Sequence, residues 1–219
     1  GYANGWAGML YGIGGATGIL LTAWLFAPVR KLRFMTMSEE LCYYTGGSKI
    51  VKNMVAIIIF LASIGWLGAH ILVGGLYLAW ASGIDINTAK IIVAVGFIFY
   101  VGIGGYKAVS WIDTLQSIVL FAGFILLAVL SVSYVGGWDV VVASTDPKAY
   151  TLFGIGKLGI YPAMSLAVVI CIGVLATPSY RQRIYSANST KAIRQSFVIT
   201  GLLYMGFSFL PAIIGMATH

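Results

Sequence analysis

The stretch Gly104-Gly105-Tyr106-Lys107-Ala108-Val109-Ser110-Trp111-Ile112-Asp113-Thr114-Leu115-Gln116 lies between two long apolar runs. It brings together a glycine pair, a base, aromatic rings, a carboxylate and hydroxyl groups. A membrane-spanning helix needs about 20 predominantly apolar residues, and the runs on both sides approach or exceed that length. A short polar segment between two such runs predicts a turn at a membrane surface.

The composition of the whole chain agrees with this interpretation. Of the 219 residues, 60% are hydrophobic and only 9% are charged, and the mean hydropathy is +0.95. A soluble domain has roughly 25% charged residues. The net charge of +7 does not favour a nucleic-acid partner, because the basic residues cluster in short segments between apolar runs. We therefore expect an all-α integral membrane protein that lies in a lipid bilayer.

Six stretches are apolar enough to cross a bilayer, and together they predict one transmembrane domain over residues 1–219. The predicted spans cover residues 6–29, 51–82, 89–105, 115–135, 158–178 and 197–217. The second stretch is long enough to require a tilted helix or an extension beyond the bilayer.

The basic residues between the spans predict the orientation. Ten of the thirteen fall on one side of the predicted membrane: Arg30, Lys31, Arg33, Lys49, Lys52, Lys107, Arg181, Arg183, Lys191 and Arg194. The other three, Lys90, Lys148 and Lys157, fall on the opposite side. The positive-inside rule makes the first side cytoplasmic, so both ends of this chain are expected on the extracytoplasmic side of the cell membrane.

The opening stretch resembles the GG-aromatic-x-AV-x-x-TD-x-x-Q signature of the sodium:solute symporter family, which includes sodium-coupled proline, pantothenate and sugar carriers. Gly104, Gly105, Tyr106 and Gln116 match the signature, and Ile112 stands where the family usually has Thr. Residues 178–183 resemble the family's P-x-x-x-x-R segment, with Arg183 at its arginine.

This resemblance implies a fold of which the chain covers only a part. The family core has ten helices in two inverted five-helix repeats, the LeuT-type arrangement expected of secondary transporters. The six predicted spans then correspond to core helices two to seven, and the chain is expected to be an internal fragment of a larger carrier. The family's main sodium site uses core helices one and eight, so the fragment alone is not expected to transport.

Asp113 is the only acidic residue in the opening stretch. From the sequence it has two interpretations. Asp113 or Ser110 could cap the helix that follows, where a side-chain oxygen and a negative charge are favourable. The resemblance instead implies a tentative sodium-binding role near the intracellular exit route, with Ser110 and Thr114 beside it.

The fifth predicted span contains Gly173 and ends in Thr177 and Pro178. Proline removes a backbone donor and clashes with the carbonyl one turn earlier. This pattern predicts either simple termination of the helix or a broken helix that lines the substrate path, as in other secondary transporters.

Two further residues are candidates for the substrate path. His70 lies in the middle of the second span, where an ionisable side chain either binds a neighbouring helix or lines an aqueous cavity. The first span is rich in glycine, and the pairs Gly8/Gly12 and Gly14/Gly18 predict close helix packing. Tyr11 is the polar side chain that this span offers to a substrate.

The leading functional hypothesis is a sodium-coupled symporter that imports a small organic solute by alternating access. The form of residues 104–116 is closer to the proline and pantothenate branches than to the sugar branch, which favours an amino acid or organic acid. The alternative is a carrier-like sensor domain of a signalling protein. The spans contain no HExxH motif or paired carboxylates, so we expect neither an enzyme nor a cofactor besides the transported sodium ion.

Overall fold

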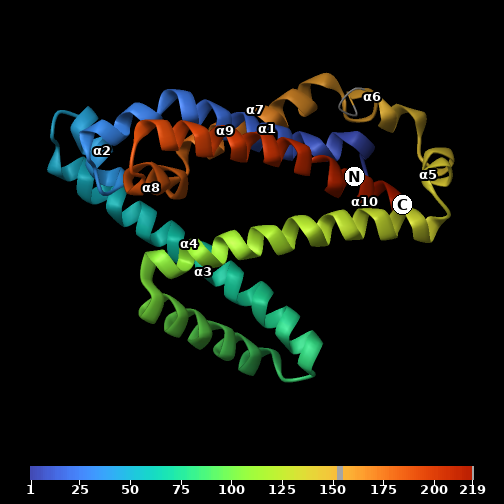
Figure 1. The fold of residues 1–219 in the computed structure, drawn as a ribbon, viewed down its shortest axis with the longest axis horizontal. Coiled ribbons are helices and arrows are strands. Elements are labelled where there is room, and N and C mark those ends of the chain that lie inside the picture. The colour runs from blue at the N-terminus through green and yellow to red at the C-terminus, as the bar shows by residue number, and fades with distance from the viewer. Residues whose placement is uncertain (152–154, 219) are drawn as a thin grey trace. The chain divides into compact units, whose positions relative to one another are not determined.

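The computed structural model describes residues 1–151 and 155–218. The regular elements in these ranges are helices (Figure 1). The chain divides into two compact units. Unit 1 contains Gly1–Glu39 and Leu120–His219, and unit 2 contains Glu40–Val119.

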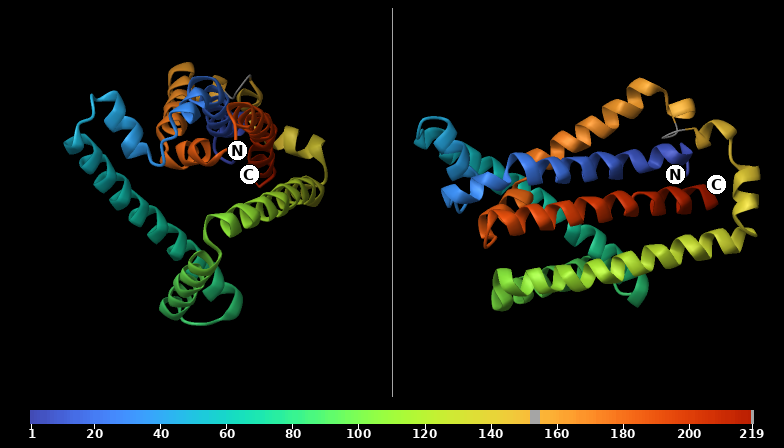
Figure 2. Two further views of the ribbon diagram at one scale, coloured as in Figure 1. Left: turned by 60° about the vertical axis from the view of Figure 1, so that its left-hand side comes forward. Right: turned by 45° about the horizontal axis from the view of Figure 1, so that its top comes forward.

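Unit 1 is built around α1 (Leu10–Leu25), which packs against α7 (Ile160–Ala176) and α9 (Thr190–Phe207). Figures 1 and 2 show α1 and α9 side by side and running in opposite directions. A Cβ atom on Gly14 would clash with the carbonyl oxygen of Ala167, and one on Gly18 would lie 2.7 Å from that of Cys171. The prediction that this glycine pair permits close helix packing is therefore confirmed, and the partner helix is α7.

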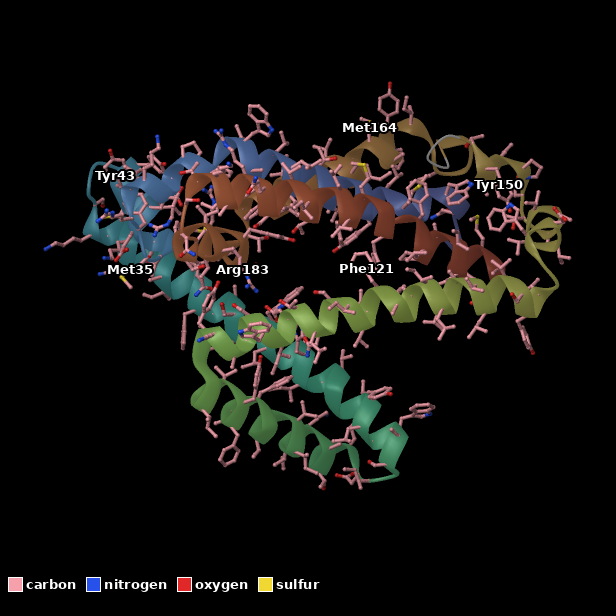
Figure 3. All side chains as sticks on the ribbon, viewed as in Figure 1. Met35, Tyr43, Phe121, Tyr150, Met164 and Arg183 are labelled. Atoms are coloured by element: carbon pink, nitrogen blue, oxygen red, sulfur yellow. The ribbon has the colours of Figure 1, made fainter. Side chains whose placement is uncertain are left out.

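Shorter elements complete unit 1. The 3₁₀ helices η1 (Gly5–Met9) and η2 (Ala27–Leu32) flank α1, and α10 (Phe209–Ala217) follows α9 after Ser208. The segment before α7 contains α5 (Trp138–Ser144), η3 (Pro147–Tyr150) and α6 (Ile155–Leu158). The C-terminal part of α4 also belongs to unit 1, where the rings of Phe121 and Phe124 contact Phe207 of α9 at centroid distances of 5.0 and 4.9 Å (Figure 3).

The largest buried cluster of unit 1 joins η2, α8 (Pro178–Ser186) and α9 to the end of α1. Its buried members are Ile19, Ala23, Ala27, Ile184, Ile193 and Phe197. The guanidinium of Arg181 lies 3.2 Å from the ring centroid of Phe26 at the rim of this cluster, a cation–π contact. This cluster fixes the end of α1 against the two helices that follow the proline break.

Unit 2 contains α3 (Lys49–Ser82) and the first part of α4 (Ile86–Val135). The hydroxyl of Ser48 accepts a hydrogen bond from the Val51 amide at the start of α3, and Gly83 ends the helix with φ 73°. The Asp85 carboxylate then accepts bonds from the amides of Asn87 and Thr88 at the start of α4. The short helix α2 (Met37–Tyr44) begins at the boundary between the two units.

The structure differs from the sequence prediction in the segment that was expected to be a loop. Residues 106–114 are helical, and α4 covers both predicted spans 89–105 and 115–135. A helix of 50 residues would be about 75 Å long, more than twice the hydrocarbon thickness of a bilayer. The helix α4 is not continuous over this length, because it is interrupted at Gly105. The φ of 54° and ψ of −161° at Gly105 are readily adopted by glycine alone. The chain therefore turns at Gly105 alone, whereas the sequence predicted a turn over residues 106–114.

Other span ends differ as well. The predicted span 6–29 is interrupted after Leu25, and the predicted span 197–217 begins seven residues earlier, at Thr190. Four helical stretches in the described part of the chain are long and apolar enough to cross a membrane: Gly5–Leu25, Lys49–Ser82, Ile86–Val135 and Thr190–Ala217. The bent pair Ile160–Ala176 and Pro178–Ser186 makes a fifth candidate. These helices fit a multi-pass membrane protein.

Candidate functional site

The first candidate site is a polar stripe on α4, formed by Ser110, Asp113, Thr114 and Ser117. Their spacing of i, i+3, i+4 and i+7 places them on one face of the helix that resumes after Gly105. Ser110 and Asp113 are half-buried, whereas Thr114 and Ser117 are exposed. The structure thus brings the three predicted sodium-pathway residues together and adds Ser117.

Hydrogen bonds along the stripe orient its oxygens. The hydroxyl of Thr114 donates to the carbonyl of Ser110 at 2.9 Å, and that of Ser117 donates to the carbonyl of Asp113 at 2.7 Å. A hydroxyl that has given its single proton to a carbonyl keeps oxygen lone pairs that can accept or bind a cation. Together with the Asp113 carboxylate, the stripe offers oxygen ligands of the kind that hard cations prefer.

The position of these residues excludes one of the two interpretations of Asp113. The helix resumes immediately after Gly105, so Ser110 and Asp113 lie inside it rather than at its start. Only the first four amides of a helix lack intrahelical partners. Ser110 and Asp113 are therefore not first-turn capping residues of this helix, and sodium binding by Asp113 stays a prediction.

The second candidate site is the break between α7 and α8. Thr177 has an extended conformation, with φ −72° and ψ 123°, and Pro178 is the first residue of α8. The two helices meet at a bend of 44°. The Thr177 hydroxyl donates to the carbonyl of Gly173 at 2.7 Å, which binds one of the carbonyls released at the end of α7. Of the two interpretations, the broken helix describes the structure better, since a second helix starts at once.

Two tyrosines, Tyr180 and Tyr204, pack against the buried cluster of unit 1 that includes Ile184 of α8. Tyr204 of α9 packs its ring against Gly15 of α1, where a Cβ atom would be 2.6 Å from the ring. The Tyr180 ring lies 6.3 Å from the ring of Phe197 in α9, centroid to centroid. Tyr11, which the sequence singled out, is exposed. Tyr180 and Tyr204 were not predicted from the sequence, although a hydroxyl-bearing ring inside an apolar span was a usable signal for Tyr204.

The remaining predicted residues lie elsewhere. His70 is an exposed residue of α3 in unit 2, and its Nδ1 is 2.8 Å from the carbonyl oxygen of Trp66 on its own helix. This contact lies within α3, and the two interpretations of His70 stay predictions. Arg183 is an exposed residue of α8 (Figure 3). Tyr11, Gly173, Thr177 and Pro178 share unit 1, whereas His70 and the polar stripe belong to unit 2.

Within the residues that the structure describes, no three His, Cys, Asp or Glu side chains gather in the manner of a metal centre. The two candidate sites themselves offer oxygen atoms and helix ends.

Comparison with known proteins gives a consistent set of relatives. The family model described as "Sodium:solute symporter family" matches residues 1–218. The chain is 26% identical to the sodium/pantothenate symporter of Escherichia coli over 175 residues, which is 78% of this chain and 36% of that protein. It is 28% identical to the high-affinity proline transporter PutP of Bacillus subtilis over 171 residues, 76% of this chain and 35% of that protein.

A mammalian relative is also similar. The chain is 31% identical to solute carrier family 5 member 4 of Rattus norvegicus over 145 residues, 59% of this chain and 22% of that protein. The chain thus matches well under half the length of each of these relatives. No solved structure matches it significantly.

Proposed function

Because this chain belongs to the sodium:solute symporter family, we propose that the protein containing it couples the entry of sodium ions to the import of a small organic solute across the cell membrane. In this proposal the sodium gradient drives transport by alternating access. The chain supplies part of a core built from two inverted five-helix repeats, with its basic segments on the cytoplasmic side and both of its ends outside.

The observation that carries the proposal is the polar stripe of α4. A carboxylate and three hydroxyl groups lie on one face of a helix that is otherwise suited to a bilayer. Ionisable residues inside membrane helices are expensive, and they mark ion or substrate pathways in most cases. We assign Asp113, Ser110 and Thr114 to the route by which sodium leaves the protein.

The substrate that we favour is an amino acid or another small organic acid. The relatives include a proline transporter and a pantothenate symporter, and both of these named substrates carry a carboxylate. The break after Thr177 exposes the N-terminal end of α8, where backbone amides and the helix dipole attract negative groups. Gly173, Thr177, Pro178 and Tyr11 are then the substrate-pathway residues of unit 1, and His70 is a further candidate in unit 2.

A reconstitution experiment tests the function. The protein that contains this chain is placed in proteoliposomes, and uptake of labelled proline, pantothenate and a panel of amino and organic acids is followed with an inward sodium gradient or with potassium alone. We expect at least one carboxylate-bearing solute to enter at least about tenfold faster with sodium, the effect of about 1.4 kcal/mol of coupling. Uptake that is equal in potassium would contradict sodium coupling, and uptake of sugars only would contradict the substrate class.

Replacing Pro178 tests the role of the broken helix. The change Pro178→Ala restores a backbone donor and removes the ring that prevents α7 from continuing into α8. We expect the maximal rate of sodium-driven uptake to fall at least about tenfold, equivalent to about 1.4 kcal/mol, because the break no longer forms reliably. Pro147→Ala is the matched control, since Pro147 also lies at the start of a short helix but away from α7. Equal transport by both variants would remove the break from the mechanism.

A further inference from the structure

A basic pocket lies at one end of the α1–α9 pair in unit 1. It is formed between η2 and the first turns of α9 and has a volume of about 500 Å³. We call it the η2–α9 pocket; its lining residues are Pro28, Lys31, Thr190, Lys191, Arg194 and Gln195. None of these residues belongs to the two candidate transport sites.

The charge of the η2–α9 pocket is unbalanced. Lys31, Lys191 and Arg194 each carry a positive charge, and no carboxylate within the described residues forms an ion pair with any of them. The Arg194 guanidinium lies 5.8 Å from the centroid of the Trp24 ring, which carries no charge. A cluster of cations without a counter-charge is a favourable place for an anion.

The start of α9 strengthens this preference. The helix has 18 residues, its first turn contains no acidic side chain, and the Ser189 hydroxyl caps it by accepting a bond from the Ala192 amide. The N-terminal end of a helix carries a partial positive charge, which disfavours Lys191 in the first turn. An anion in the pocket would relieve the repulsion among the three cations and between Lys191 and the helix end.

The walls of the pocket are held in place by the fold. The Nε of Arg30 donates to the carbonyl of Ala187, which ties η2 to the loop before α9. Ala27 of η2 and Ile193 and Phe197 of α9 are buried in one cluster, which holds the same two elements together. The three cations therefore meet without any rearrangement of the backbone.

The pocket also lies at the ends of two candidate membrane spans. The apolar stretch Gly5–Leu25 ends just before it, and the stretch Thr190–Ala217 begins in it. Trp24, 73% exposed, and Leu25, 57% exposed, lie beside it on α1. Tryptophan at the end of a span is typical of the interface between lipid tails and headgroups. From these observations we propose that the η2–α9 pocket binds the phosphate headgroup of an anionic phospholipid, whose tails lie along the exposed apolar end of α1.

Native mass spectrometry of the intact protein tests this proposal. The protein in detergent is incubated with phosphatidylglycerol or with phosphatidylcholine of the same acyl chains. The detergent is then removed in the mass spectrometer, and the fraction of protein that retains bound lipid is measured. We expect phosphatidylglycerol to bind at least about tenfold more tightly than phosphatidylcholine, because each basic residue near a lipid surface adds to the attraction. The triple variant Lys31→Gln/Lys191→Gln/Arg194→Gln should lose most of this preference.

A second triple variant separates the pocket from general charge. Lys49, Lys107 and Lys148 are exposed and lie outside the pocket, so their change to Gln removes the same net charge. This control, and the charge-preserving variant Lys31→Arg/Lys191→Arg, should keep the preference for phosphatidylglycerol, and circular dichroism should show equal helix content in all variants. Equal loss in both triple variants would overturn the proposal. Complete displacement of the lipid by millimolar inorganic phosphate would overturn it too, because the pocket would then be a site for a soluble anion.

Discussion

The double variant Gly14→Ala/Gly18→Ala is expected to lower the stability of the protein strongly. At both positions a Cβ atom would meet the backbone of α7, at the carbonyl oxygens of Ala167 and Cys171. Backbone atoms cannot move aside as the end of a side chain can, so α1 and α7 must separate. Such overpacking costs about 1–3 kcal/mol at each site. We expect the midpoint of thermal unfolding in detergent to fall by roughly 5–15 °C.

The matched control for this variant is Gly65→Ala/Gly68→Ala in α3. A Cβ atom on either of these glycines meets nothing within 4 Å. Replacing glycine by alanine in an unobstructed helix is favourable by roughly 0.5–1 kcal/mol, because alanine loses less conformational freedom on folding. The control should therefore unfold at the same temperature as the natural protein or slightly above it. If both double variants lost stability equally, close packing of α1 on α7 would not be the cause.

These glycines also illustrate what the sequence could predict. Their spacing of four residues identified a face of the first span on which another helix approaches closely. The spacing contains no information about which helix that is, since every other span is equally apolar. The partner is determined by the three-dimensional packing, in which α7 follows α1 by more than 130 residues and still contacts it along its length.

The error at residues 106–114 has a different physical origin. Hydropathy separates spans by their polar residues, so a polar segment between apolar runs was interpreted as a loop. A helix with one polar face has the same average hydropathy as a loop. The positions of Ser110, Asp113, Thr114 and Ser117 repeat with the period of a helix, and that periodicity was the signal that could have identified the stripe. The start of α9 was missed for the same reason, because Lys191 and Arg194 lowered the hydropathy of its first turns, although Ser189 is a typical capping residue.

The family resemblance and the structure contribute different parts of the candidate site. The signature identified Asp113, whereas the structure shows that Asp113 shares its helix face with three hydroxyl groups and lies inside the helix rather than at its start. The proline pattern indicated a weak point in the fifth span, and the structure adds the 44° bend and the immediate start of α8. Tyr180 and Tyr204 come from different helices, so no local pattern could have placed both against the same buried cluster.

The change Asp113→Asn is expected to have the largest effect on sodium coupling. Asparagine keeps the size of the side chain but replaces a full negative charge by a dipole, so the attraction for a cation falls sharply. We expect the sodium concentration for half-maximal uptake to rise at least about tenfold, equivalent to about 1.4 kcal/mol of lost binding free energy. The hydrogen bond from the Ser117 hydroxyl should persist, because it is accepted by the main-chain carbonyl of residue 113, which the substitution keeps.

Asp139→Asn is the control for this substitution. Asp139 is an exposed residue in the first turn of α5 in unit 1, so the change removes the same charge from a different surface. Its sodium activation curve should match that of the natural protein. If Asp113→Asn left the curve unchanged while the protein remained folded, the stripe would have no part in sodium transport. If it lowered only the maximal rate, with unchanged half-activation, Asp113 would act in sodium release and not in sodium affinity, because an interaction made only during the crossing alters the rate and not the binding.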